Sequence, residues 1–160
     1  MKNKAFTLIE VLVAVLIIGI LAAIAVPQYK VAVGKSQYIT MKPIVKLLYE
    51  SNTRYYLSNG TFPKKFADLD IDLPIEQEND LTTYFIIKLK NIDCYIMPNF
   101  NMYCSREIFG TTMMYHIIGS EKKCVSYSPN ENYFANRICQ QETGQKYGSC
   151  SDFRCIYEYP

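Results

Sequence analysis

Residues 6–26 read FTLIEVLVAVLIIGILAAIAV, a stretch in which Glu10 is the only charged residue. At about 1.5 Å per residue, a helix of this length is roughly 30 Å long, which matches the hydrocarbon core of a bilayer. A carboxylate in that core costs on the order of 2.5 to 3.5 kcal/mol, so an acid there is expected to have a partner and a function. The stretch therefore predicts a membrane-spanning helix with a functional acid.

The residues before this stretch predict its orientation. They read MKNKA and carry two lysines, Lys2 and Lys4. Basic flanks stay in the cytoplasm, so the remainder of the chain is expected to lie outside it.

Length and charge limit what the remainder can be. Of 160 residues, about 100 follow position 59, enough for one small domain. The net charge of +2 and the pI of about 8.1 are too mild for a nucleic-acid-binding surface, so nucleic acid is not an expected partner.

The cysteines indicate an oxidising compartment. All six lie in the distal part of the chain, and an even count in a small exported domain predicts disulfides. Six cysteines allow 15 pairings. We favour pairs of near neighbours, Cys94 with Cys104, Cys124 with Cys139 and Cys150 with Cys155. The sequence has no C-x-x-C and a single histidine, His116, so no metal or cofactor is expected.

Three interpretations of the N-terminus compete. A secretory signal peptide would be cut after the small residues Ala23-Ile24-Ala25, but its apolar run is usually shorter and uncharged. A plain signal anchor accommodates the length and leaves Glu10 unexplained. The third interpretation follows from a resemblance.

The segment MKNKAFTLIEVLVAVLIIGILAAIAVPQY closely resembles the N-terminus of type IV pilins and type II secretion pseudopilins. The resemblance implies that a prepilin peptidase cuts between Ala5 and Phe6 and methylates the new amine of Phe6. Ala5 stands where the family usually has glycine. Glu10 takes the place of the family's assembly glutamate and is expected to pair with the Phe6 amine of a neighbouring subunit.

The resemblance also implies partners and a location. The expected partners are copies of the chain or other pilins, the prepilin peptidase, a platform protein with its assembly ATPase, and membrane lipid. The chain is expected in the bacterial inner membrane, single-pass with its head outside the cytoplasm, and then in a pilus or a periplasmic pseudopilus.

The apolar stretch is expected to continue into a stalk, giving one helix over residues 6–58 that bends at Pro27, Gly34 and Pro43. An apolar stripe at steps of three and four predicts the face that packs on the head, formed by Met41, Val45, Leu48, Asn52 and Tyr55. The other face carries lysines expected to be solvated, at Lys30, Lys35, Lys42 and Lys46, with Glu50 nearby. Gly60 is placed for a left-handed helix cap.

Residues 59–160 are expected to form the head. A loop over about 59–83 contains a short helix at 63–69, and β-branched and aromatic alternation predicts strands at 84–90, 93–97, 101–109 and 112–118. A disulfide-bounded region over about 124–160 contains a short helix capped by Asn130 or Asn132. With a leader at 1–5 and the helix at 6–58, this is an α+β chain: a long N-terminal helix packed on an antiparallel sheet of three or four strands, the type IV pilin fold.

Catalysis and calcium binding find no support in the sequence. Asp68, Asp70 and Asp72 alternate, but an EF-hand begun at Asp68 would need glycine and glutamate where Leu73 and Asn79 stand. No phosphate-binding glycine loop or nucleophile elbow is present.

We therefore expect a structural subunit of a type IV pilus or a type II secretion pseudopilus. The alternative is a minor pilin or tip adhesin that binds a surface, a secreted substrate or DNA through its tyrosines.

Overall fold

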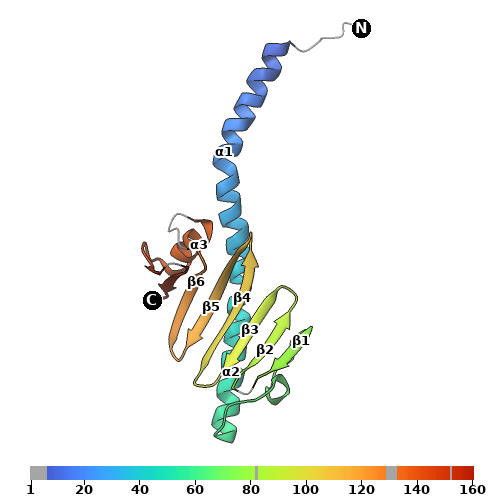
Figure 1. The fold of residues 1–160 in the computed structure, drawn as a ribbon, viewed down its shortest axis with the longest axis vertical. Helices are drawn as coiled ribbons and strands as arrows, with labels where there is room; N and C mark the ends of the chain where they lie inside the picture. The colour runs from blue at the N-terminus through green and yellow to red at the C-terminus, as the bar shows by residue number, and fades with distance from the viewer. Residues whose placement is uncertain (1–6, 82, 129–132, 152) are drawn as a thin grey trace.

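A long helix runs through the molecule, and a sheet packs on one side of its C-terminal half (Figure 1). The computed structural model describes residues 7–81, 83–128, 133–151 and 153–160. The helix comprises α1 (Leu8–Ile39) and α2 (Met41–Asn59). The fold is the α+β architecture expected from the sequence, a long N-terminal helix on an antiparallel sheet with three disulfides in the C-terminal region.

Local chemistry sets the ends of the helix. The Thr7 and Glu10 side chains cap its start, and Gly60 adopts the left-handed conformation at its end, with φ of 69°. The interruption at Thr40 lies shortly before Pro43. Because proline has no N–H, the carbonyl of Ile39 loses its helical donor.

In the described parts of the chain, the sheet has eight antiparallel strands in the order β1-β2-β3-β4-β5-β6-β8-β7. Their bounds are β1 (Gln77–Asp80), β2 (Phe85–Leu89), β3 (Ile92–Met97), β4 (Asn101–Ile108), β5 (Thr111–Ile118), β6 (Glu121–Ser126), β7 (Ser149–Cys150) and β8 (Cys155–Glu158). The four expected strands correspond to β2 to β5. The expected total of three or four was too small.

The missed strands have a physical explanation. β1 consists of polar residues that are all exposed at the sheet edge, and β6 begins Glu-Lys-Lys, so neither has the apolar alternation of a half-buried strand. β7 and β8 contain only two and four residues. Neighbouring strands and disulfides define these elements more than local pattern does.

Two expected helices differ in extent. The helix expected at 63–69 is a single 3₁₀ turn, η1 (Phe66–Asp68). In the C-terminal region, α3 (Phe134–Thr143) has Tyr133 at its N-cap position without a side-chain cap. The expected caps, Asn130 and Asn132, lie outside the described residues.

The three disulfides join the near-neighbour pairs that the sequence favoured. Cys94–Cys104 links opposed residues of β3 and β4, and Cys150–Cys155 links β7 to β8. Cys124–Cys139 fastens β6 to α3, and both of its cysteines are fully buried. The Cys124–Cys139 bridge therefore attaches α3 to the sheet.

Gly34 has a packing role. A Cβ at this position would lie 2.8 Å from Cδ1 of Ile138 on α3 and 3.3 Å from Cγ2 of Ile108 at the end of β4. Glycine thus lets α3 and the β4–β5 turn approach the helix backbone closely. The bends expected at Pro27, Gly34 and Pro43 stay predictions. Pro27 lies inside α1, which continues through it.

The apolar stripe of α2 faces the sheet as expected. Met41, Val45 and Leu48 are buried, and Tyr55 is half-buried. Asn52 on the same stripe is also completely buried, and neither its amide nitrogen nor its oxygen has a hydrogen-bond partner among the described residues.

Asn52→Leu is expected to stabilise the head. A buried amide without partners costs about 1–3 kcal/mol, and leucine has a similar size and no polar atoms. The free energy of unfolding, measured by denaturant titration of the full chain in detergent, should rise by about that amount. The matched control is Ser51→Ala at the adjacent buried position, because the Ser51 hydroxyl donates to Asp70 at 2.6 Å and its loss should lower stability. If Asn52→Leu lowers the free energy of unfolding, the conclusion that the buried Asn52 amide has no hydrogen-bond partner is wrong.

Candidate functional site

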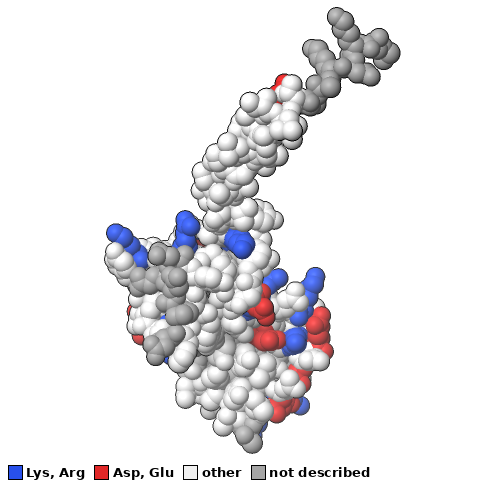
Figure 2. All heavy atoms as spheres, turned by 45° about the horizontal axis from the view of Figure 1, so that its top comes forward, with Lys and Arg blue, Asp and Glu red and all other residues white. Residues whose placement is uncertain are grey.

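The N-terminal half of α1 is an exposed apolar surface. Every residue from Leu8 to Lys30 is exposed, and the large apolar side chains up to Val26 have exposed fractions of 49% to 78%. Figure 2 shows this part of the helix projecting from the head, with almost no charged atoms. Among the described residues, Leu8–Asn59 is the helix long and apolar enough to cross a membrane. So large an apolar surface needs lipid or other protein chains to cover it.

Glu10 lies at the start of this surface and caps the helix. Its Oε2 atom accepts hydrogen bonds from the Thr7 backbone N–H at 2.8 Å and from the Thr7 hydroxyl at 2.6 Å. The Glu10 N–H in turn donates to the Thr7 hydroxyl oxygen at 3.4 Å. The carboxylate thus has local partners in the single chain, and the helix N-terminus favours its negative charge.

Thr7 caps the helix, a role that was not predicted from the sequence. The signal was present, because Thr7-Leu8-Ile9-Glu10 matches the capping-box pattern T-x-x-E ahead of an apolar run. The other residues expected to act here, Ala5 and Phe6, lie outside the described residues. Cleavage between them and the pairing of Glu10 with an amine remain predictions.

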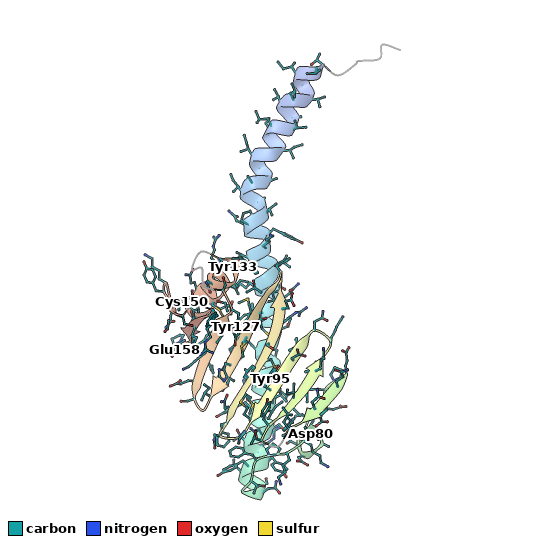
Figure 3. The ribbon with its side chains drawn as sticks, viewed as in Figure 1. Asp80, Tyr95, Tyr127, Tyr133, Cys150 and Glu158 are labelled. Carbon is teal, nitrogen blue, oxygen red and sulfur yellow. A yellow bond between two sulfur atoms is a disulfide. The ribbon has the colours of Figure 1, made fainter. Side chains whose placement is uncertain are left out.

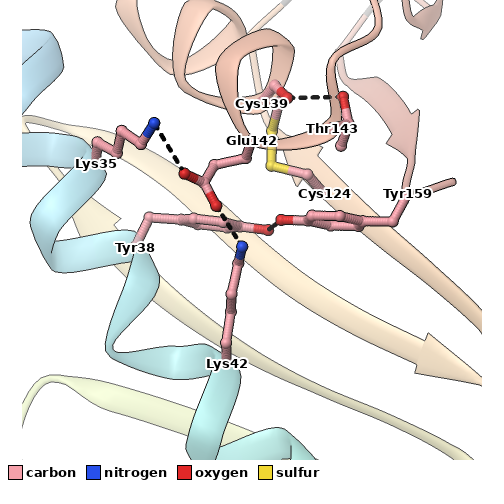
Figure 4. Close-up of polar contacts among 8 residues, drawn as sticks. All are labelled: Lys35, Tyr38, Lys42, Cys124, Cys139, Glu142, Thr143 and Tyr159. Atoms are coloured by element: carbon pink, nitrogen blue, oxygen red, sulfur yellow. Dashed lines mark hydrogen bonds and ion pairs between the residues drawn. A yellow bond between two sulfur atoms is a disulfide. The ribbon is translucent and has the colours of Figure 1, made fainter.

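A second polar centre lies where the stalk meets α3 (Figure 4). The Glu142 carboxylate accepts from Lys35 Nζ at 3.1 Å and from Lys42 Nζ, and its side chain is 8% exposed. The Lys42 ammonium also lies 4.7 Å from the ring centroid of Tyr159, whose hydroxyl is 3.2 Å from that of Tyr38. The expectation of a solvated lysine face was therefore wrong for Lys35 and Lys42, which hold α3 and the C-terminal segment on the stalk.

The ionisation of this centre follows its contacts. Burial alone would raise the pKa of Glu142, but the hydrogen bonds and charges of Lys42 and Lys35 outweigh it and hold the pKa below its usual value. Burial raises the pKa of Tyr38 well above its ordinary range, and the nearby Tyr159 adds to this effect. At neutral pH the centre is therefore a carboxylate between two ammonium groups beside two neutral phenols.

Glu142→Gln is expected to lower the free energy of unfolding by about 1–3 kcal/mol at neutral pH, because two ammonium groups lose a charged acceptor. The pKa of Glu142 is lower in the folded chain than in the unfolded chain. The stabilisation is therefore present above about pH 4.5, the ordinary value, and is lost as the pH falls through the folded value. Denaturant titrations at neutral and acidic pH should give a difference between wild type and variant that shrinks in acid.

The control for this prediction is Glu50→Gln. Glu50 is exposed and pairs with Lys46 at 3.7 Å within one helix. Such a pair contributes about 0.3–0.5 kcal/mol. Equal effects of the two substitutions would contradict a special role for Glu142.

The remaining candidate residues have structural contacts. His116 Nε2 lies 2.6 Å from Oδ1 of Asn101 on the neighbouring strand, and burial, with Lys123 and Arg154, lowers its pKa to about 4. Asp68 accepts from the backbone N–H groups of Lys64 and Lys65. Asp70 binds Arg54 through two hydrogen bonds. Among the described residues, no group of three or more histidine, cysteine, aspartate or glutamate side chains is placed to hold a metal ion.

Comparison with known proteins gives one family-model match, at the N-terminus, and several curated relatives. Residues 1–26 match the family model described as the prokaryotic N-terminal methylation motif. The chain is 38% identical over 62 residues to the type IV major pilin protein PilE of Neisseria gonorrhoeae, covering 39% of this chain and 37% of that protein. It is 40% identical over 55 residues to the type IV major pilin protein PilA of Myxococcus xanthus, covering 34% and 25%.

A third relative, the type IV major fimbrial protein FimA of Dichelobacter nodosus, is 62% identical over 35 residues, which cover 22% of each chain. The chain thus spans about two fifths of the length of the first curated relatives that it matches. No solved structure gives a significant match. The family-model match lies at the N-terminus, in residues 1–26.

Proposed function

We propose that this chain, a member of the type IV pilin family by its N-terminal segment and its fold, is a structural subunit of a type IV pilus. The main support for the proposal is the exposed apolar N-terminal half of α1, whose first turn contains the single acid Glu10. Lipid covers the apolar surface of such a helix while the chain is in a membrane. The helices of other copies cover it once the chain is in a filament.

Processing would supply the partner for Glu10. In our proposal the prepilin peptidase cuts between Ala5 and Phe6 on the cytoplasmic side and methylates the Phe6 amine. The amine of one subunit then lies against Glu10 of a neighbour that is displaced along the filament axis. The opposite charges neutralise each other in a region of low dielectric, which makes the pair strong when both partners are present.

The proposed location follows from the orientation of the helix. The subunit waits in the bacterial inner membrane with its head outside the cytoplasm, where an oxidising environment permits the three disulfides. The platform protein and assembly ATPase then raise it into the filament. The relatives named as type IV major pilins favour a pilus over a secretion pseudopilus and a major over a minor subunit. The function is assembly, with no chemistry of its own.

Shearing of filaments from the cell surface tests this proposal. A major subunit should be the dominant protein of the sheared fraction, and deletion of its gene should remove the filaments. A scarce protein whose deletion leaves the filament mass unchanged would instead be a minor pilin or a tip adhesin. Absence of the chain from every filament fraction, with a periplasmic assembly present, would favour the pseudopilus.

A further inference from the structure

The head begins very close to the end of the apolar stretch. Val31 is already buried against the head, five residues after Val26, and Gly34 touches α3 and the end of β4. These positions lie about 8 and 12 Å beyond Val26 along the helix. The headgroup layer extends about 5–8 Å beyond the hydrocarbon core on each side, and spanning helices tilt by about 20° on average. One edge of the head therefore lies within a side-chain length of that layer.

Aromatic side chains gather at this edge. Figure 3 shows Tyr133 at the end of the head nearest the bare helix, and Figure 1 shows β4 running toward the same end. The Phe134 ring contacts both Tyr133 and Phe109, with centroids 4.7 and 5.6 Å apart. Phe109 is 45% exposed, Tyr133 is 38% exposed, and Tyr29 on α1 is 66% exposed. We name these four residues, Tyr29, Phe109, Tyr133 and Phe134, the aromatic rim.

Phe109 has an unusual backbone conformation. It forms the two-residue turn between β4 and β5 with Gly110, and both have positive φ, 49° and 78°. Such turns favour asparagine, aspartate or glycine, and a bulky residue with positive φ is strained. Phe100 has a similar φ of 54°, but its ring packs against Tyr49, Tyr56 and Phe62. Phe109 contacts Phe134, but nearly half of its surface stays exposed among the described residues, so packing there accounts for it only in part.

The charge beside the rim is favourable for a lipid surface. Lys30 follows Tyr29, and Arg137 lies on α3 after Phe134; both are exposed. Arg106 and Glu107 on β4 have opposite charges, and Glu142 is already paired with two lysines. Figure 2 shows blue atoms where the bare helix enters the head. Tyrosine and cations at the end of an apolar span are typical of the membrane–water interface.

We propose that the aromatic rim rests in the headgroup layer of the bilayer while the subunit is in the membrane, so that lipid holds the head upright before assembly. The inference rests on the proposed function, because it requires the apolar half of α1 to span the membrane. The rim continues directly from that span, and its phenylalanine, tyrosine and cationic groups suit an interface that is apolar on one side and wet on the other.

Depth-dependent quenching tests the proposal, because the chain contains no tryptophan. Single variants Phe109→Trp, Tyr133→Trp, Leu57→Trp and Leu16→Trp of the full chain are reconstituted at low density in phosphatidylethanolamine–phosphatidylglycerol vesicles. Some lipids carry a nitroxide on the headgroup or bromine on the acyl chain. Leu57 is the control for an exposed head position, since it is 78% exposed near the far end of α2. Leu16 is the control for the span.

The proposal expects strong quenching of Phe109→Trp and Tyr133→Trp by the headgroup nitroxide, little quenching of Leu57→Trp, and strong quenching of Leu16→Trp by bromine. If the rim variants are quenched as weakly as Leu57→Trp while Leu16→Trp is quenched by bromine, the proposal that the aromatic rim contacts the headgroup layer is wrong. The proposal that α1 spans the membrane would still stand. An unquenched Leu16→Trp variant would overturn the membrane span and the rim together.

Phe109→Asn separates lipid contact from folding. Asparagine suits the turn, so the free energy of unfolding should stay equal or rise. In a Tyr133→Trp background the substitution should reduce quenching by the headgroup nitroxide. Unchanged quenching with a stable head would overturn a role for Phe109 at the lipid surface.

Discussion

Glu10→Gln should leave the chain inserted in the membrane and abolish filament formation. Glutamine keeps the capping-box geometry with Thr7, since that motif accepts glutamate or glutamine, so the helix start is preserved. Only the charge is lost. In the proposed filament the Phe6 amine would then be buried without a counter-ion, which costs about 3–5 kcal/mol for each subunit contact. Membrane fractionation should find normal insertion, and electron microscopy of sheared fractions should find no filaments.

Thr7→Val is the matched control for this prediction. It removes the hydroxyl that bonds Glu10 and retains the charge. Loss of a cap costs about 0.5–2 kcal/mol within the chain, and it leaves the proposed intersubunit pair possible. Filaments should therefore persist in Thr7→Val. Filaments of normal abundance in Glu10→Gln would refute the pairing, and loss of filaments in Thr7→Val would mean that assembly also requires the Thr7 hydroxyl.

The double substitution Cys124→Ala/Cys139→Ala is expected to have the largest effect on the head. The bridge closes a loop with a sequence separation of 15 residues, and both sulfurs are fully buried between β6 and α3. Loop closure of this size contributes about 3 kcal/mol, and loss of buried contacts adds to the cost, for a total of about 3–5 kcal/mol. Denaturant unfolding of the full chain should show this loss, with α3 unfolding at the lowest denaturant concentration. The proposed removal of the leader should be unaffected, since the proposed cut between Ala5 and Phe6 precedes the helix.

Cys150→Ala/Cys155→Ala is the control for that experiment. Its loop has a sequence separation of 5 residues, Cys150 is exposed, and the bridge closes the two-stranded edge of the sheet. The expected loss is about 2 kcal/mol. A larger loss from this variant than from Cys124→Ala/Cys139→Ala would contradict the view that the link from α3 to β6 is the main crosslink of the head.

Patterns with one dominant physical cause could be predicted from the sequence. An unbroken apolar run makes a helix whatever surrounds it, and the alternation around Ile87, Cys94 and Met113 marks strands with one face on the core. Gly60 marks a helix end because the left-handed conformation suits glycine. These signals are local, so the chain around each residue is enough to interpret it.

Features that depend on distant partners could not be predicted. β6 is a strand because it pairs with β5 and β8, and β8 is a strand because it pairs with β6 and β7. Lys35 and Lys42 looked like solvated lysines because Glu142 lies about a hundred residues away in sequence. Gly34 suggested a bend because nothing nearby in sequence indicates Ile138. Thr7 differs from these residues, because its partner Glu10 is only three positions away and the capping-box motif can be recognised in the sequence.

The most direct test of the central claim is the intact mass and the N-terminal residue of the mature chain, isolated from membranes and from sheared filaments. A chain that begins with N-methylated Phe6 in both fractions is the expected result. A chain beginning at Val26 would mean that the apolar stretch is an ordinary signal peptide, and an intact Met1 in the filament fraction would mean that no leader is removed. Either result would contradict a pilin that polymerises through the amine of Phe6 and the carboxylate of Glu10.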